Sequence, residues 1–351
     1  MATNRNHTVD ILRGCAIFFV VFGHVTHNVE LRTYIWGFHI PIFFFLSGLL
    51  FKKEKFLCFR NFLASRFKSL LVPYAIFYLL TYIYWLLVER HVRGADISPI
   101  SQLFGLVYGT YDMRFMMFNG ALWFIPCLFS MEISFWLLAK SKRKGCILFF
   151  SLISYVTGLY MSTVAGWLPW GICAALIGMV FYSLGFLNKG LLVYYRSSTR
   201  SRLSNFVLFL CLLGGQILLL PWTGADLAML KVGNVWLYIP IALLGISAYW
   251  CFSIVLAKNL VLEFLGRNSL VIFAFQEPVY IIIIFVSAKV LSVDVEQIRC
   301  NIVLCLLIAI ISIAVIMPLI YGWNRYGKKQ IAVCAKYVIN RKKELIGNGN
   351  I

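Results

Sequence analysis

Three ionisable residues lie in an apolar segment near the start of this sequence, in the stretch DILRGCAIFFVVFGH at residues 10–24. Asp10, Arg13 and His24 are costly inside a bilayer, so residues of this kind usually serve a function or pair with one another. On a helix the eleven residues from Arg13 to His24 turn through about 1,100° and rise about 16 Å, which returns both to nearly one face. An imidazole titrates near neutral pH, so His24 can serve as a general base or as a nucleophile.

A plainer interpretation exists for each of these residues. For Asp10 we favour the plainer interpretation, in which Asp10 and Arg13 form an ion pair at the membrane interface. For His24 the plainer alternative is a hydrogen bond to a neighbouring helix, but an inward-facing imidazole is the better candidate for function. The pattern predicts Asp10 and Arg13 at one mouth of the bundle and His24 deep within it or toward the other side.

The next apolar segment, FHIPIFFFLSGLL at 38–50, carries His39, Ser47 and Gly48. His39 is expected on the same side of the membrane as His24, so two histidines can flank one vestibule. The alternative for His39 is a wetted ring at the interface. For Ser47 and Gly48 the alternatives are cavity lining and a site of close helix packing, where small residues let backbones approach.

Two later segments carry polar groups in apolar surroundings. ALWFIPCLFSMEISFW at 121–136 contains Trp123 and Glu132, and a lone carboxyl group there must protonate or find a cation. Glu132 is the second catalytic candidate after His24, or else a neutral acid that joins two helices. LGRNSLVIFAFQEPVY at 265–280 contains Asn268, Ser269 and Gln276, which we predict, together with Trp123, to line the cavity.

The elements that must position these groups are membrane helices. Of the 351 residues, 61% are hydrophobic and 13% are charged, which is too apolar for a soluble globule of this size. Apolar runs of about 20 residues, enough to cross a bilayer as helices, recur throughout. Ten spans are predicted, at 9–27, 34–51, 70–88, 119–139, 146–161, 169–187, 204–221, 235–257, 264–288 and 301–320. The predicted fold class is an all-α polytopic membrane helical bundle of about ten helices, with an integral-membrane domain at 1–323 and a basic tail at 324–351.

The cations are distributed unevenly along these spans. With the N-terminus inside, only seven of the 32 Lys and Arg residues fall outside, namely Arg32, Arg90, Arg93, Arg114, Lys231, Lys289 and Arg299. The positive-inside rule therefore places both termini in the cytoplasm. This distribution accounts for the net charge of +19 without nucleic acid as a partner. The cysteines are scattered without ligand spacing, so no metal is expected.

These residues also carry a resemblance. The chain resembles membrane acyltransferase family 3, the bacterial integral-membrane enzymes that O-acylate surface carbohydrates, in DILRG with the Arg-x10-His spacing, FHIPIFFFLSGLLF, RFKSLLVPY, ALWF and LGRNSL. The order and spacing match from residue 9 to about 280. The family often has Arg-x-x-Arg where this chain has Arg66 and Lys68, and many members have His at the position of Gln276.

The resemblance implies a function. It implies transfer of an acyl group from cytoplasmic acyl-CoA, with acetyl-CoA as the expected donor, to a hydroxyl of a surface polysaccharide or lipid-linked glycan. It also implies a multi-pass protein of the bacterial inner membrane, with membrane lipids around it. By the same resemblance Arg13 and His24 are the residues most closely tied to activity, and Asp10, Arg66 and Lys68 are expected near the donor.

Two questions stay open at this stage. His24 can act as a general base on the acceptor hydroxyl or as a nucleophile that forms an acyl-imidazole. A polysaccharide exporter or small-molecule transporter, in which the polar stripe lines a path, is the alternative class, although we find none of the paired halves that transporter folds often show. The outer segment 89–118 is expected to influence the choice of acceptor.

Overall fold

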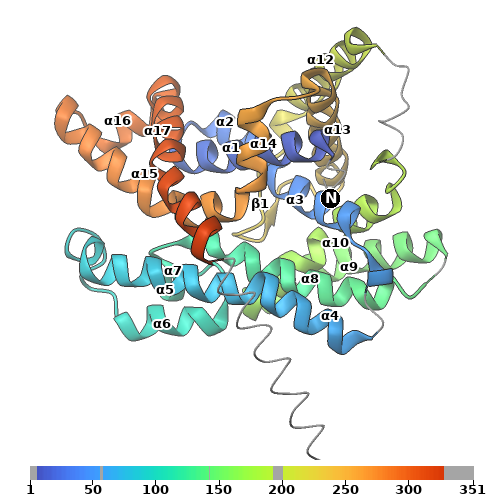
Figure 1. Ribbon diagram of the computed structural model, residues 1–351, viewed down its shortest axis with the longest axis horizontal. Helices are drawn as coiled ribbons and strands as arrows, with labels where there is room; N and C mark the ends of the chain where they lie inside the picture. Colours follow the sequence, from blue (N-terminus) through green and yellow to red (C-terminus); the bar gives the residue numbers. More distant parts are fainter. Residues whose placement is uncertain (1–5, 56–57, 142, 193–200, 328–351) are drawn as a thin grey trace, which may run out of the picture.

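The computed structural model describes residues 6–55, 58–141, 143–192 and 201–327 (Figure 1). Of the predicted tail at 324–351, residues 328–351 lie outside the described residues, and the first four continue the last helix as a π-helical turn, Trp323–Gly327.

Helices make up most of the described chain. The longer ones are α1 (His7–Val25), α3 (His39–Leu50), α5 (Val72–Leu87), α8 (Phe124–Leu138), α9 (Lys144–Val164), α10 (Ile172–Leu187), α12 (Arg202–Leu218), α13 (Tyr238–Leu256), α15 (Ser269–Leu291) and α17 (Ile302–Gly322). The shorter ones are α2 (Val29–Trp36), α4 (Phe59–Arg66), α6 (Pro99–Tyr108), α7 (Met113–Met116), α14 (Leu260–Arg267) and α16 (Val295–Cys300). A two-stranded antiparallel hairpin pairs β1 (Ala225–Asp226) with β2 (Lys231–Val232).

The predicted fold class is confirmed. Nine helical stretches of the described chain are long and apolar enough to cross a membrane. The predicted span at 204–221 corresponds to α12, which is apolar but has only 17 residues. The protein is therefore a multi-pass, all-α membrane bundle.

Helix α1 lies at the centre of the contacts. It packs against α3, α13, α14, α15 and α17. Glycines let α1 and α14 approach backbone to backbone: a Cβ atom added at Gly14 would lie 2.0 Å from the carbonyl oxygen of Leu262, and one at Gly266 would lie 2.0 Å from that of Asp10. This close approach fixes the position of the helix that carries His24.

A second close approach joins α3 to α10. A Cβ atom at Gly48 would lie 1.9 Å from the carbonyl oxygen of Tyr182, and one at Gly185 would lie 2.0 Å from that of Phe45. Gly48 therefore serves helix packing, as small residues often do in membranes. Neither Gly48 nor the half-buried Ser47 lines the cavity described below, which corrects the expectation that they would.

The start of α1 and the turn after α17 are both linked to the break between α14 and α15. Asp10 forms an ion pair with Arg267, Oδ2 to Nε at 3.2 Å, and the next residue, Asn268, accepts a hydrogen bond from Asn324. In Figure 1 helices α4 to α10 lie along one side of the molecule, and α1, α2 and α13 to α17 along the other. The cavity described below lies between segments of both groups, at the opposite end of α1.

Candidate functional site

A cavity of about 400 Å³ lies at the Val25 end of α1, the end that the charge distribution assigns to the outside. This volume is in the range of sites for small molecules. Its lining comes from α1, α2, α3, the segment 93–123, the hairpin, α15 and α16. The polar and aromatic lining residues are His24, His27, Arg32, Trp36, His39, Arg93, Tyr111, Trp123, Asp226, Phe273, Glu277, Tyr280 and Arg299.

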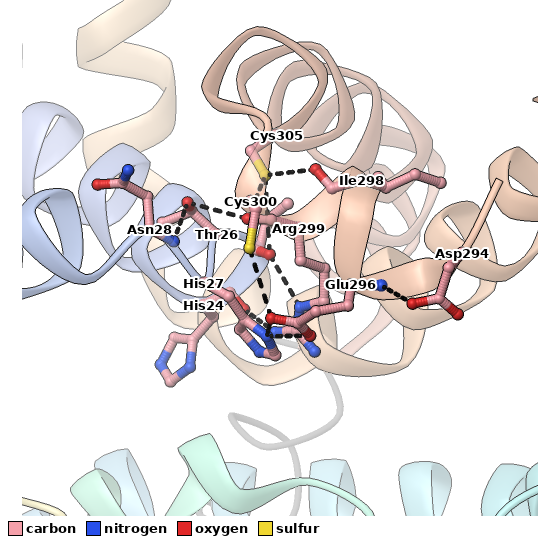
Figure 2. A network of polar contacts seen from close by, with 11 residues as sticks. His24, Thr26, His27, Asn28, Asp294, Glu296, Ile298, Arg299, Cys300 and Cys305 are labelled. Atoms are coloured by element: carbon pink, nitrogen blue, oxygen red, sulfur yellow. Dashed lines mark hydrogen bonds and ion pairs between the residues drawn. The ribbon is translucent and has the colours of Figure 1, made fainter.

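His24 lies in the last turn of α1, and Arg299 holds the backbone there. The guanidinium of Arg299 donates to the carbonyl oxygens of His24 (2.7 Å) and Val25 (3.1 Å), which have no partner within the helix. The carbonyl oxygen of Arg299 accepts in return from the amide of His27 at 2.6 Å and from the hydroxyl of Thr26 at 3.3 Å. Figure 2 shows these contacts and the His24 imidazole pointing away from them. Among the described residues no group forms a hydrogen bond with that imidazole.

His27 forms a second link between the same segments. Its Nδ1 atom lies 2.8 Å from a carboxylate oxygen of Glu296 on α16 (Figure 2). Burial lowers the pKa of His27, although the hydrogen bond to Glu296 opposes this effect. The hydrogen bond from His27 lowers the pKa of Glu296. The segment after α1 is therefore joined to α16 by the His27–Glu296 contact as well as by the hydrogen bonds of Arg299.

His39 begins α3 and is buried, with 6% of its surface exposed. Its Nδ1 atom lies 2.9 Å from the carbonyl oxygen of Ile35. Because a carbonyl only accepts, Nδ1 carries the proton, and the neutral ring has its free lone pair on Nε2. The bond thus selects the tautomer in which Nε2 can take up a proton.

Glu277 supplies a carboxylate from α15. Its Oε2 atom accepts a hydrogen bond from the amide of Ala121 at 3.3 Å, near the start of α8. Arg93 also lines the cavity, but it is already engaged, since its Nε atom donates to Glu89 at 2.8 Å. The carboxylate of Glu277 is therefore held by backbone and remains able to accept from a ligand hydroxyl.

Arg32 and Trp36 supply a cation and an aromatic face from α2. The guanidinium carbon of Arg32 lies 4.1 Å from the centroid of the Trp36 ring, a cation–π arrangement. The Trp36 ring centroid lies 6.5 Å from that of His24. The stacking therefore holds a guanidinium beside the imidazole.

The outer segments close the cavity. Asp226 belongs to the hairpin, and its Oδ1 atom accepts from the amides of Ala228 (3.1 Å) and Met229 (3.2 Å). Burial raises the pKa of Asp226 and also that of Tyr111, which lies in the segment between α6 and α7. The outer segment 89–118 thus contributes Arg93 and Tyr111 to the lining.

Of the predicted site residues, His24, His39 and Trp123 line this cavity. Arg13 and Asp10 do not, because they lie near the other end of α1. Arg13 is half-buried, and none of the described residues forms a hydrogen bond or ion pair with it. Asp10 pairs with Arg267 rather than with Arg13. The structure therefore separates the predicted inner and outer groups.

Glu132 also lies away from the cavity. It is buried on α8, and its Oε2 atom lies 3.2 Å from Nη1 of Arg66 on α4. This ion pair gives the predicted carboxylate the cation that its burial requires. Lys68 is half-buried in the π-helical turn Phe67–Leu71 and does not line the cavity either.

The three residues predicted from the ninth span are absent from the lining, which corrects that expectation. Asn268 lies at the break between α14 and α15 and donates to the carbonyl oxygen of Phe264 at 2.8 Å. Ser269 is the first residue of α15. Gln276 is fully buried, and its side-chain atoms have no hydrogen-bond partner within the described segments. Its neighbour Glu277 faces the cavity instead.

Several cavity residues were not predicted as site residues: Arg32, Arg93, Tyr111, Asp226, Glu277, Tyr280 and Arg299. A signal for some of them existed in the sequence, since Arg32, Arg93 and Arg299 belong to the few outer cations, and Glu277 is an acid within an apolar span. No group of His, Cys, Asp and Glu side chains suited to a metal ion occurs in the described parts of the chain.

The fold and the cavity together define a class: a multi-pass membrane protein with a histidine-lined chamber at one end of its first helix. Comparison with known families makes this specific, because the acyltransferase domain of membrane acyltransferase family 3 matches residues 6–330. The chain belongs to this family and is an integral-membrane acyltransferase. Searches of curated proteins and of solved structures gave no match.

Proposed function

We propose that the protein transfers an acyl group, expected to be acetyl, from cytoplasmic acyl-CoA to a hydroxyl of a surface polysaccharide or lipid-linked glycan. The observation that carries this proposal is the cavity, whose lining combines three imidazoles with two carboxylates and several aromatic rings. Carboxylates accept hydrogen bonds from sugar hydroxyls, and aromatic rings offer apolar faces to a small ligand. We further propose the bacterial inner membrane as its location.

The donor is proposed to approach from the inner end of α1. The guanidinium of Arg13 there forms no hydrogen bond or ion pair with any of the described residues, and guanidinium groups bind phosphates well. Arg13 and His24 are eleven residues apart, about 16 Å along the helix. A thin pantetheine arm is suited to span this distance. Asp10, Arg66 and Lys68 remain proposed members of the donor side.

His24 is the proposed catalytic residue, and two routes are open to it. As a general base it takes the proton of the acceptor hydroxyl while the oxygen attacks the thioester carbonyl; the carbon–sulfur bond breaks, and the thiolate takes up the proton. As a nucleophile it attacks first, releases the thiol and forms an acyl-imidazole, which the hydroxyl then cleaves. His39, with its lone pair on Nε2, is placed to assist proton transfer in either route.

The test uses the full chain in membrane vesicles with labelled acetyl-CoA, and measures the label in the glycan fraction. We expect His24→Ala to abolish transfer and His91→Ala, at an exposed histidine that does not line the cavity, to leave it at the wild-type rate. Wild-type transfer by a correctly inserted His24→Ala protein would refute the site. Mass spectrometry of the protein with donor alone separates the routes, because only the nucleophilic route leaves an acyl group on His24.

A further inference from the structure

The cations of the cavity differ in whether they already have partners. Arg93 donates to Glu89. Arg299 donates to the carbonyl oxygens at the end of α1. The guanidinium of Arg32 forms no hydrogen bond and no ion pair with any of the described residues, and it stacks on the face of Trp36. Arg32 is therefore the uncommitted cation of the cavity.

Arg32 is also restrained. It is half-buried, and its guanidinium stacks at 4.1 Å on an indole that lies beside His24. Stacking leaves the edge of the guanidinium, where its N–H groups lie, free to bind an oxyanion with two parallel hydrogen bonds. A fixed, partly dehydrated cation of this kind loses little conformational entropy when it binds an anion.

The carboxylates near Arg32 form no ion pair with its guanidinium. Asp226 contributes to the electrostatic field at Arg32 without forming an ion pair with it, and its Oδ1 atom accepts the amides of Ala228 and Met229. Glu277 accepts the amide of Ala121 on another wall. The cavity thus offers the carboxylates of Asp226 and Glu277 as acceptors for hydroxyl groups. Separately, it offers the N–H groups of Arg32 as donors to an anion.

We propose that the acceptor is an anionic sugar, whose carboxylate or phosphate group binds Arg32 while its hydroxyls bind the carboxylates of the cavity. This inference rests on the proposed function, and it names the class of acceptor. Carboxylate and phosphate share the oxyanion chemistry that a guanidinium recognises, so the experiment must separate a uronic acid from a sugar phosphate.

The experiment measures ligand binding without turnover. Diethyl pyrocarbonate modifies imidazoles, and mass spectrometry follows the modification of His24 in the full-length protein in nanodiscs. Glucuronic acid, glucose 6-phosphate and glucose are titrated as protecting ligands. We expect one of the two anions to protect His24 at a concentration about tenfold lower than the concentration of glucose that is needed. A difference of this size corresponds to one additional charged hydrogen-bonded contact, between the anion and Arg32. The anion that protects better identifies the source of the charge.

Variants assign the preference to its residue. Arg32→Gln should abolish the difference between the anions and glucose, and Arg32→Lys should retain part of it because the charge remains. Asp226→Asn should act in the opposite direction and widen the preference for the anions over glucose, since it removes a negative charge near Arg32 while its amide oxygen still accepts from a sugar hydroxyl. Lys289→Gln removes an exposed outer cation that stacks on Phe285 outside the cavity, and should leave the preference unchanged.

Three outcomes would overturn the inference: equal protection by glucose and both anions, no protection by any of the sugars, or an undiminished anion preference in Arg32→Gln. None of these depends on acyl transfer. A protein that transfers acetyl groups but prefers glucose would retain the proposed function and lose the anion site. A protein that binds the anions but transfers no acetyl group would retain the anion site and lose the proposed function.

Discussion

The clamp that Arg299 forms on the end of α1 is open to a direct test. Arg299→Gln removes two hydrogen bonds from a charged donor to the carbonyl oxygens of His24 and Val25. Such bonds contribute about 1.5–3 kcal/mol each when buried. Because Arg299 is half-buried and water can replace part of the loss, we expect the last turn of α1 to be destabilised by about 2–3 kcal/mol.

Hydrogen exchange measures this loss at specific amides. The amide of Thr26 donates to Phe22 and that of His27 donates to Arg299. If both open locally, a loss of about 2–3 kcal/mol speeds their exchange by about 30- to 150-fold. We also expect the acyl-transfer kcat to fall by about 10- to 100-fold, since a small displacement of a reacting group costs rate of this order.

Two comparisons separate the clamp from a simple effect of charge. Arg299→Lys keeps the charge but cannot donate to two neighbouring carbonyls with a planar fork, so fast exchange should persist. Arg90→Gln removes an outer arginine that donates to the carbonyl oxygen of Ala95 and does not line the cavity, and should alter neither readout. Slow exchange at Thr26 and His27 together with a wild-type kcat in folded Arg299→Gln would refute the reasoning.

Three further predictions follow from the packing and the charges. Gly14→Ala should lower the thermal midpoint strongly, because its Cβ would meet the backbone of α14, whereas Gly145→Ala, with nothing within 4 Å, should not; equal midpoints would contradict the close approach. Glu132→Gln leaves the Arg66 cation without its carboxylate and should destabilise by about 1–3 kcal/mol in thermal unfolding, while reducing kcat less than His24→Ala does. Folding lowers the pKa of His27, so below pH 6.5, the ordinary pKa of histidine, the unfolded chain binds more protons than the folded protein does. The stability of the protein should therefore fall as the pH drops below 6.5. His27→Gln should remove this part of the pH dependence of the thermal midpoint.

The helices and the position of His24 followed from local rules. Continuous apolar runs must become helices in lipid, so the spans were predictable from composition alone. The separation of Arg13 and His24 to opposite ends of α1 followed from the helical rise. His39 was placed on the same side as His24 because two successive spans share the loop between them.

The rest of the cavity depends on contacts between distant segments. Asp226, Tyr111 and Arg299 belong to outer segments whose approach to α1 no local pattern encodes. Gln276 and Glu277 show a second cause: neighbouring helical residues differ by about 100° in direction, so one is buried in the bundle while the other reaches the cavity. Without the neighbouring helices, the sequence does not say which of the two faces inward.

The walls of the chamber come from both ends of the chain, from Gly23 to Arg299. During synthesis α1 emerges hundreds of residues before the arginine that fixes its end. The chamber therefore cannot close until Arg299 has left the ribosome and entered the bilayer. A product terminated before Arg299 would carry the imidazole of His24 without the walls that the later segments supply.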